Sequence, residues 1–150
     1  MRATLLSLLL FASPAFAGWN IDTNQSISPS TNQDGIAAEW SWNTAISPFE
    51  RGPQLESTHS FALGKNQDFD RLGLGLRQEL SPMVAVSAHA VWVRLDQADR
   101  AGAQAALSTR LWRSDAYSTS LGLYVYGGTA LAPDDNWWWS GAGLQLSFGK

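Results

Sequence analysis

The stretch Arg71-Leu-Gly-Leu-Gly-Leu-Arg77 decides the fold expected for this chain. Successive side chains of an extended strand point to opposite faces, so Leu72, Leu74 and Leu76 would share one face. The opposite face would carry only small and charged residues, namely Gly73, Gly75, Arg77 and Glu79. This alternation predicts a β-strand with one apolar face and one polar face.

The same two-sided pattern recurs in later segments. Within 137–149, Leu144 and Leu146 alternate with glycine, Gln145 and serine, and within 116–126 leucines alternate with serine, glycine and tyrosine. Helical periodicity is weak throughout, and turn-forming residues separate the segments. We therefore predict an all-β chain with eight strands, at 18–26, 35–44, 56–64, 70–80, 83–95, 101–113, 116–126 and 137–149.

The N-terminus has the organisation of a secretory signal peptide. Arg2 supplies a positive region, residues 4–12 an apolar region, and Ala15-Phe16-Ala17 a small-residue cleavage site. We expect residues 1–17 to be removed, which leaves a single β-barrel domain at 18–150. The signal predicts export to the cell envelope of a Gram-negative bacterium.

A membrane helix is not expected in the mature chain. Such a helix needs about eighteen or more uninterrupted apolar residues, and the best candidate, 83–95, is interrupted by Ser87, His89 and Arg94. Lipid offers no hydrogen-bond partners, so a chain that crosses it without helices must form a closed barrel. The predicted fold is an antiparallel up-and-down transmembrane β-barrel.

Composition excludes several kinds of chemistry. The chain has no cysteine, so disulfides and thiolate metal sites are ruled out. The formal net charge is −3, which does not favour a nucleic-acid surface. His59 and His89 make a poor metal pair, and the Gly-x-Gly sequences at 73–75 and 141–143 do not open a helix as a phosphate-binding loop would. We expect no cofactor and no metal.

Connection lengths point to the orientation of the barrel. Bacterial membrane barrels alternate short periplasmic turns with longer external loops. With a periplasmic N-terminus, Ser81-Pro82 and Ser114-Asp115 would be short periplasmic turns, whereas 45–55 is longer than this pattern predicts. The connections expected on the external side are 27–34, 65–69, 96–100 and 127–136.

Aromatic residues give further support, because tryptophan and tyrosine favour the boundary between membrane and water. The predicted register places Trp92 and 137–139 near external strand ends, and Trp40 and Trp42 near periplasmic ends. Trp112 departs from the pattern, since its parity groups it with inward-facing residues. The residues predicted at the membrane boundary are Trp40, Trp42, Trp92, Trp137, Trp138, Trp139 and Phe148.

Together, a cleaved signal, about eight strands and a final strand Gly141-Ala-Gly-Leu-Gln-Leu-Ser-Phe148 resemble the small outer-membrane barrels of the OmpA, OmpX and OmpW type. The Leu-Gly-Leu-Gly-Leu strand followed by a Ser-Pro turn is also similar to YfaZ-type proteins. The resemblance implies contact with outer-membrane lipids and lipopolysaccharide. It also implies recognition of the final strand by the barrel-assembly machinery, although Gly149 and Lys150 follow the terminal aromatic residue.

Eight strands enclose a lumen that side chains can fill, so no wide pore is expected. By parity, the polar interior network should contain Glu39, Arg77, Glu79, His89, Gln104, Arg110, Tyr124 and Gln145. Buried charges persist only when they are paired and hydrogen-bonded. We therefore expect Arg77 and Arg110 to meet Glu39 or Glu79 across the lumen.

The leading functional hypothesis is an outer-membrane protein, not an enzyme, with a structural or surface-interaction role and an undetermined oligomeric state. An alternative is a soluble periplasmic or secreted barrel that binds a small ligand. It is suggested by a weakly apolar presumed lipid face that contains Ala85, Ala101, Ala103 and Ala105. Leucines that point outward would favour the membrane, and leucines that point inward the soluble barrel.

A weaker alternative is a lipid-modifying enzyme. Serine nucleophiles need a histidine within hydrogen-bond reach. Ser60 cannot readily use His59, because adjacent residues on a strand point to opposite faces. Ser87 and His89 share a face but are separated by roughly 7 Å along the strand.

Overall fold

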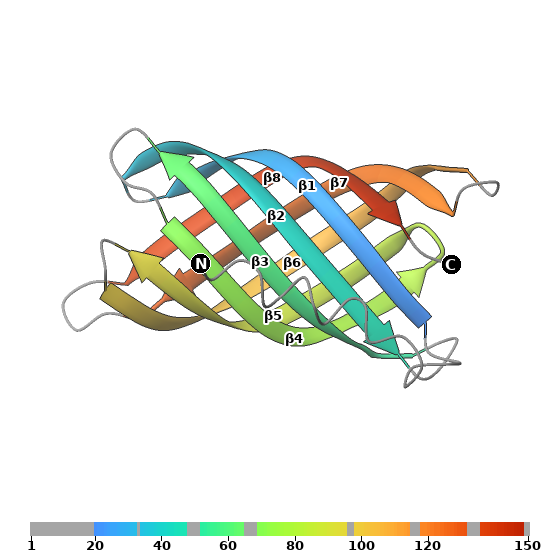
Figure 1. Ribbon diagram of the computed structural model, residues 1–150, viewed down its shortest axis with the longest axis horizontal. Coiled ribbons are helices and arrows are strands. Elements are labelled where there is room, and N and C mark those ends of the chain that lie inside the picture. Colours follow the sequence, from blue (N-terminus) through green and yellow to red (C-terminus); the bar gives the residue numbers. More distant parts are fainter. Residues whose placement is uncertain are drawn as a thin grey trace, which may run out of the picture.

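The computed structural model describes residues 20–32, 34–47, 52–64, 69–95, 98–114, 118–131 and 136–148, and the predicted signal peptide lies outside them. Eight strands form one closed barrel in sequence order, each antiparallel to its neighbours (Figure 1). They are β1 (Asn20–Asn32), β2 (Gly35–Ser47), β3 (Gln54–Gly64), β4 (Phe69–Ser81), β5 (Val84–Leu95), β6 (Ala98–Ser114), β7 (Thr119–Ala130) and β8 (Trp137–Phe148). The predicted fold class is confirmed.

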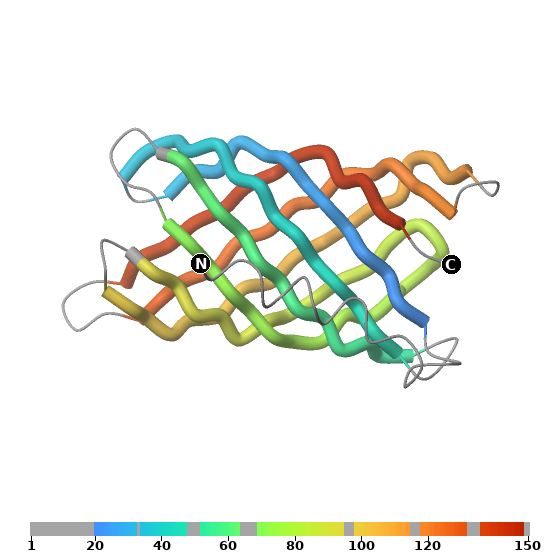
Figure 2. Tube along the Cα trace, viewed as in Figure 1, coloured from blue at the N-terminus to red at the C-terminus, as the bar shows by residue number. Residues whose placement is uncertain are grey.

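The strands wind at a slant around the barrel axis (Figure 2). Paired residues, followed once around the barrel from Ile21 on β1, lead back to β1 at Thr31, a stagger of ten residues. Strand number and stagger together set the tilt of the strands, which is typically about 35–45°. The interior of so narrow a cylinder holds side chains and not a wide channel.

The two ends of the barrel are named here by the chain termini. At the terminal end β1 begins and β8 ends, and at the distal end β1 passes into β2. The intervals between strands are 48–53, 82–83 and 115–118 at the terminal end, and 33–34, 65–68, 96–97 and 131–136 at the distal end. The expected contrast between short and long connections is therefore absent, and this prediction was wrong.

The error has a physical cause that β1 shows clearly. Residues 27–34 were expected to form a loop because they are polar, yet β1 continues to Asn32. Its polar side chains at alternate positions point into the lumen and are buried. These residues are Asn24, Ser26, Ser28, Ser30 and Asn32. A polar lumen therefore makes a strand resemble a loop in sequence.

A β-bulge explains the anomalous position of Trp112. The register of β6 against β7 shifts between Arg110 and Trp112. A bulge places two residues of one strand opposite one residue of its partner and so resets which face each side chain takes. Leu111 and Trp112 are both exposed on the outside as a result.

The ladder between β1 and β8, which closes the barrel, is interrupted near its middle. Pairing runs from Thr23 to Ile27, stops, and resumes at Ser30. Pro29 lies in the gap, and proline has no backbone N–H to donate. The described residues contain no helix that is long and apolar enough to cross a membrane.

Candidate functional site

Large apolar side chains cover the outside of the barrel. Leu74 in the stretch that predicted the fold is 58% exposed, and Leu144 on β8 is 59% exposed. Large apolar residues on every strand share this orientation. A soluble monomer rarely exposes a continuous apolar surface of this kind. The outward-facing aromatic residues include Trp40, Trp42, Trp92, Trp112, Trp138 and Phe148.

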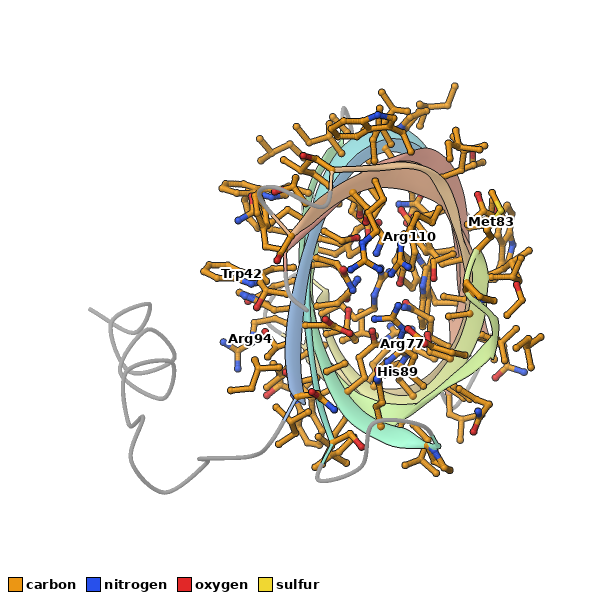
Figure 3. The ribbon with its side chains drawn as sticks, turned by 90° about the vertical axis from the view of Figure 1, so that its right-hand side faces the viewer. Trp42, Arg77, Met83, His89, Arg94 and Arg110 are labelled. Carbon is orange, nitrogen blue, oxygen red and sulfur yellow. The ribbon has the colours of Figure 1, made fainter. Side chains whose placement is uncertain are left out.

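The inside of the barrel is polar and charged. Six of the residues predicted for the interior are buried there, namely Glu39, Arg77, His89, Gln104, Tyr124 and Gln145. Arg110 is half-buried at the terminal end, and Glu79 is exposed at its rim. Figure 3, a view into the terminal end, shows Arg77, His89 and Arg110 inside the ring of strands and Trp42, Met83 and Arg94 outside it.

An arginine that sequence reasoning missed organises the distal half of the lumen. Arg71 and Glu39 form an ion pair in which both side chains are fully buried. The Arg71 Nη2 also donates to Ser60 Oγ at 3.1 Å. Ser60 Oγ donates in turn to Ser41 Oγ at 3.0 Å, and Ser41 Oγ donates to Glu39 Oε1 at 3.0 Å. The carboxylate and the guanidinium are therefore joined both directly and through two hydroxyls.

Aromatic rings enclose the same guanidinium. The Arg71 Cζ lies 5.6 Å from the ring centroid of Phe69, 5.3 Å from that of Tyr126 and 4.9 Å from that of Trp139. All three distances are within the range of cation–π attraction, which is strongest where water is excluded. The rings thus stabilise the charge on faces of the guanidinium that hydrogen bonds do not reach.

The rings interlock with glycines on the neighbouring strand. Tyr126 on β7 is paired with Gly141 on β8, and Gly128 on β7 is paired with Trp139 on β8. A Cβ atom on Gly141 would lie 2.3 Å from the Tyr126 hydroxyl, and one on Gly128 would lie 2.3 Å from the Trp139 ring. At Gly128 and Gly141 a larger side chain would collide with these rings, so glycine at these two positions makes room for Trp139 and Tyr126.

Further aromatic contacts fill the distal end. Trp137 packs edge-on against Phe69, with ring centroids 5.0 Å apart, and lies 5.4 Å from Trp139. The indole Nε1 of Trp137 donates to Asp34 Oδ2 at 3.1 Å, and that of Trp139 donates to Gln104 Oε1 at 3.1 Å. The distal half of the lumen is therefore filled with side chains.

A buried contact between a histidine and a glutamate lies nearer the middle of the lumen. His89 Nε2 lies 2.9 Å from Glu56 Oε2, and both side chains are almost completely buried. Sequence parity placed His89 inside but did not reveal its partner on β3. The Gln104 amide nitrogen lies 3.4 Å from the Tyr124 hydroxyl, a polar contact between the neighbouring strands β6 and β7.

The terminal half of the lumen holds arginines with fewer contacts. Arg77 Nη2 lies 3.9 Å from Glu79 Oε1, a neighbour on the same strand. Arg110 Nη1 donates to the backbone carbonyl of Pro82 at 2.9 Å. The expectation that both arginines would meet Glu39 or Glu79 holds in part: Arg77 pairs with Glu79, although along one strand and not across the lumen. It was wrong for Arg110, which bonds to a carbonyl, while Glu39 pairs with Arg71.

Comparisons with solved structures identify barrels of the same design. A de novo designed transmembrane β-barrel matches with a TM-score of 0.53 and 15% identity, over 87% of this chain and 95% of that chain. The crystal structure of Neisserial surface protein A (NspA) matches with a TM-score of 0.50 and 8% identity, over 89% and 97% of the two chains. The fold is that of the small membrane β-barrels. No family model and no curated protein matches the sequence.

Two of the predicted membrane-boundary residues lie instead inside this barrel. Trp137 and Trp139 are only 5% and 1% exposed, and of the three consecutive tryptophans only Trp138 points outward. The prediction was wrong for this pair because consecutive residues of a strand cannot share a face. Ala85, assigned to the lipid face, is likewise buried.

Positions along the strands also differ from expectation. Trp40 and Trp42 point outward but lie near the middle of β2, where they pair with Phe61 and His59, and not at the terminal end. Trp92 lies near the distal end of β5, and Phe148 is the last residue of β8. The outward-facing aromatic residues therefore form no simple pair of belts.

One contact between a histidine and an aspartate lies on the apolar outer face. His59 Nε2 lies 2.8 Å from Asp70 Oδ1, and both side chains are about half exposed. His59 is paired with Trp42 on one side and with Leu72 on the other. Ionisable groups on a lipid-facing surface are costly unless they are paired. Within the part of the chain that the structure describes, no three metal-ligating side chains converge.

Proposed function

We propose that this protein is a small outer-membrane β-barrel with a filled lumen and a structural or surface-interaction role. The observation that carries the proposal is the inverted distribution of side chains: leucine and tryptophan outside, and arginine, glutamate and histidine inside. A membrane reverses the usual preference, because lipid solvates apolar surface and the lumen of the barrel holds the polar groups.

The closed ladder of strands supports the same conclusion. In lipid, every backbone N–H and C=O needs a partner within the protein. A barrel in which each of the eight strands pairs on both sides provides these partners. A soluble ligand-binding barrel would instead need an open cavity, and the Arg71–Glu39 cluster and the surrounding rings occupy that space here.

The packed distal half of the lumen also argues against a role as a pore for the diffusion of solutes. Phe69, Trp137 and Trp139 fill the distal end, and Trp139 is hydrogen-bonded to Gln104 inside the lumen. The partners that we propose are the lipids and lipopolysaccharide around the outer face. During assembly, the last strand with Phe148 at its end would be read by the barrel-assembly machinery.

We propose no catalytic role for the two histidines. His89 is engaged with buried Glu56, and His59 with Asp70. A serine nucleophile needs a histidine that is oriented toward it by a third group. Both imidazoles are instead explained as partners of carboxylates, Glu56 inside the barrel and Asp70 on its outer face.

The location is tested by cell fractionation of the full-length protein. We expect it in the outer-membrane fraction, extractable only with detergent, and expect heat-modifiable migration on a denaturing gel, because a closed barrel resists unfolding in detergent. Recovery in the soluble periplasmic fraction without detergent would refute membrane insertion and revive the ligand-binding alternative.

The filled lumen is tested in planar bilayers. The purified barrel should produce no stable porin-like conductance. A double variant, Trp137→Ala with Trp139→Ala, empties the distal end and should conduct more than the wild type, while Trp138→Ala removes a neighbouring outward ring and serves as the matched control. Large, stable conductance from the wild type would contradict a closed lumen.

A further inference from the structure

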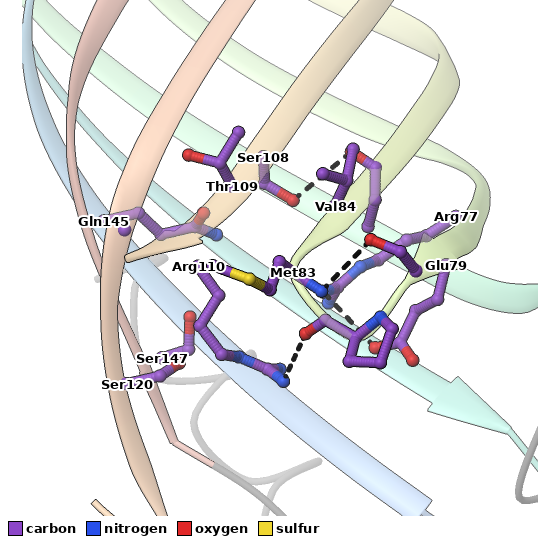
Figure 4. A pocket seen from close by; sticks show the side chains of 14 residues that line it. Arg77, Glu79, Met83, Val84, Ser108, Thr109, Arg110, Ser120, Gln145 and Ser147 are labelled. Atoms are coloured by element: carbon purple, nitrogen blue, oxygen red, sulfur yellow. Dashed lines mark hydrogen bonds and ion pairs between the residues drawn. The ribbon is translucent and has the colours of Figure 1, made fainter. Parts of the chain in front are cut away.

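Two small cavities lie in the terminal half of the lumen, just inside its mouth. Both are lined by Arg77 of β4 and Arg110 of β6, and each has a volume of about 20 Å³. A cavity needs roughly 10–15 Å³ to hold one water-sized particle. Figure 4 shows the first cavity, with the two arginine side chains reaching it from different strands.

Hydrogen-bond donors without partners face this region. Arg77 is only 7% exposed, and its Nε and Nη1 have no hydrogen-bond partner among the described residues. Its Nη2 lies 3.9 Å from Glu79, beyond hydrogen-bond distance. The hydroxyl of Thr109, which lines the first cavity, is buried without a partner as well. A guanidinium cannot lose its proton in a protein, so these donors call for an acceptor.

The charges around the cavities favour an anion as that acceptor. Three arginines, Arg77, Arg110 and Arg113, line one or both cavities, against two carboxylates, Asp22 and Glu79. Glu79, 41% exposed, and Arg113, also exposed, are partly hydrated at the rim, which leaves Arg77 and Arg110 against Asp22 as the less exposed charges. The remaining lining includes serine hydroxyls and the Gln145 amide, which can also donate to an anion.

We infer that the terminal mouth of the barrel binds a compact, singly charged anion between Arg77 and Arg110. The volume admits a halide, or the carboxylate at the end of a larger molecule whose remainder stays outside. Both share the chemistry that the site recognises, a small acceptor for guanidinium N–H groups. The inference goes beyond the proposed function and does not depend on it, since the cavities belong to the barrel itself.

Arginine resonances provide a direct test in the folded protein. In ¹⁵N-labelled barrel refolded in detergent micelles, the Nε–Hε signal of Arg77 would be followed during titration with sodium chloride and, separately, with sodium acetate. We expect a saturable shift of Arg77 in at least one titration. Arg94, an exposed arginine at the distal end, reports the general effect of ionic strength in the same spectra.

Variants locate the site. Arg77→Met should abolish the saturable shift of the remaining reporter, Arg110, and Arg110→Gln should weaken the shift at Arg77. Arg94→Gln removes an arginine of the opposite end and should leave both shifts unchanged. Heat-modifiable migration of each variant establishes that the barrel has folded, so a lost signal reports the site and not the fold.

Two further arms separate the sources of the anion. A shift with acetate and with a short peptide that has a free C-terminal carboxylate, but not with its amidated form, would assign the site to carboxylates. A saturable shift with chloride alone would assign it to halides. If Arg77 and Arg94 respond alike and linearly to every salt, and the variants change nothing, the cavities hold only water and the inference is overturned.

Discussion

The two halves of the lumen place arginine in different surroundings. At the distal half, Arg71 pairs with Glu39, donates to Ser60 and lies beside three aromatic rings, although its Nε and Nη1 have no hydrogen-bond partner among the described residues. At the terminal half, Arg77 is almost as deeply buried, yet its nearest carboxylate is 3.9 Å away and small cavities adjoin it. The difference shows that burial alone does not determine whether a charge is stabilised. The groups that contact the charge determine it.

The largest effect should follow from removing one partner of the distal pair. Arg71→Met leaves Glu39 buried without its counter-ion, and breaking such a pair lowers the free energy of unfolding by about 3–5 kcal/mol. Urea unfolding in lipid vesicles, followed by tryptophan fluorescence, measures it. The double variant Arg71→Met with Glu39→Gln removes both charges and should recover much of the loss. A single variant as stable as the wild type would contradict the assigned role of the pair.

A smaller loss is expected when the interlocked rings are disturbed. In Gly128→Val the new side chain would meet the Trp139 ring, and overpacking of this kind costs about 1–3 kcal/mol. The same unfolding measurement applies. Gly127→Val is the matched control, because a Cβ at Gly127 has its nearest neighbour at 3.6 Å, an ordinary contact. Equal effects at both glycines would show that the rings do not depend on Gly128.

The terminal arginine should respond in the opposite way from the distal one. Arg77→Met removes a buried charge whose donors lack partners, and replacing poorly paired buried charges is often neutral or stabilising. We expect the free energy of unfolding to change by less than about 1 kcal/mol, or to rise. A loss as large as that for Arg71→Met would abolish the distinction between the two halves.

The smallest effect concerns an ion pair at the distal tip of the barrel. Arg94 Nε donates to Asp99 Oδ1 at 2.8 Å, and this hydrogen bond lowers the pKa of the Asp99 carboxyl below its usual value. The pair therefore contributes stability at neutral pH that is lost as the pH falls through the lowered pKa. NMR titration of Asp99 should show its pKa rising in Arg94→Gln. An unchanged pKa in the variant would mean that Arg94 does not set it.

Sequence reasoning predicted the strands because strict alternation survives in a barrel. The leucines of β4 and β8 point outward as their parity required, and eight strands form at the predicted places, although the bounds of β1 and β7 shift by several residues. Alternation is a local property, so it can be read from neighbouring residues alone.

What could not be predicted depends on contacts between distant strands. The pairing of Arg71 with Glu39 is set by the register of β2, β3 and β4, which parity does not give. The bulge beside Trp112 reverses parity without any distinctive residue to mark it. Alternation along the strand could have shown that Trp137 and Trp139 face opposite to Trp138. The prediction instead placed all three at the membrane boundary, because tryptophan favours that position.

The break in the ladder beside Pro29 has a consequence for how the cylinder can come apart. A proline nitrogen can never supply the missing hydrogen, so no rearrangement of side chains completes this seam. The first and last strands, β1 and β8, are therefore paired on both sides of the gap but not within it. Among the amide hydrogens in strand interiors, those on β8 that flank the gap should exchange earliest with solvent deuterium, and lateral separation of β1 from β8 would begin there.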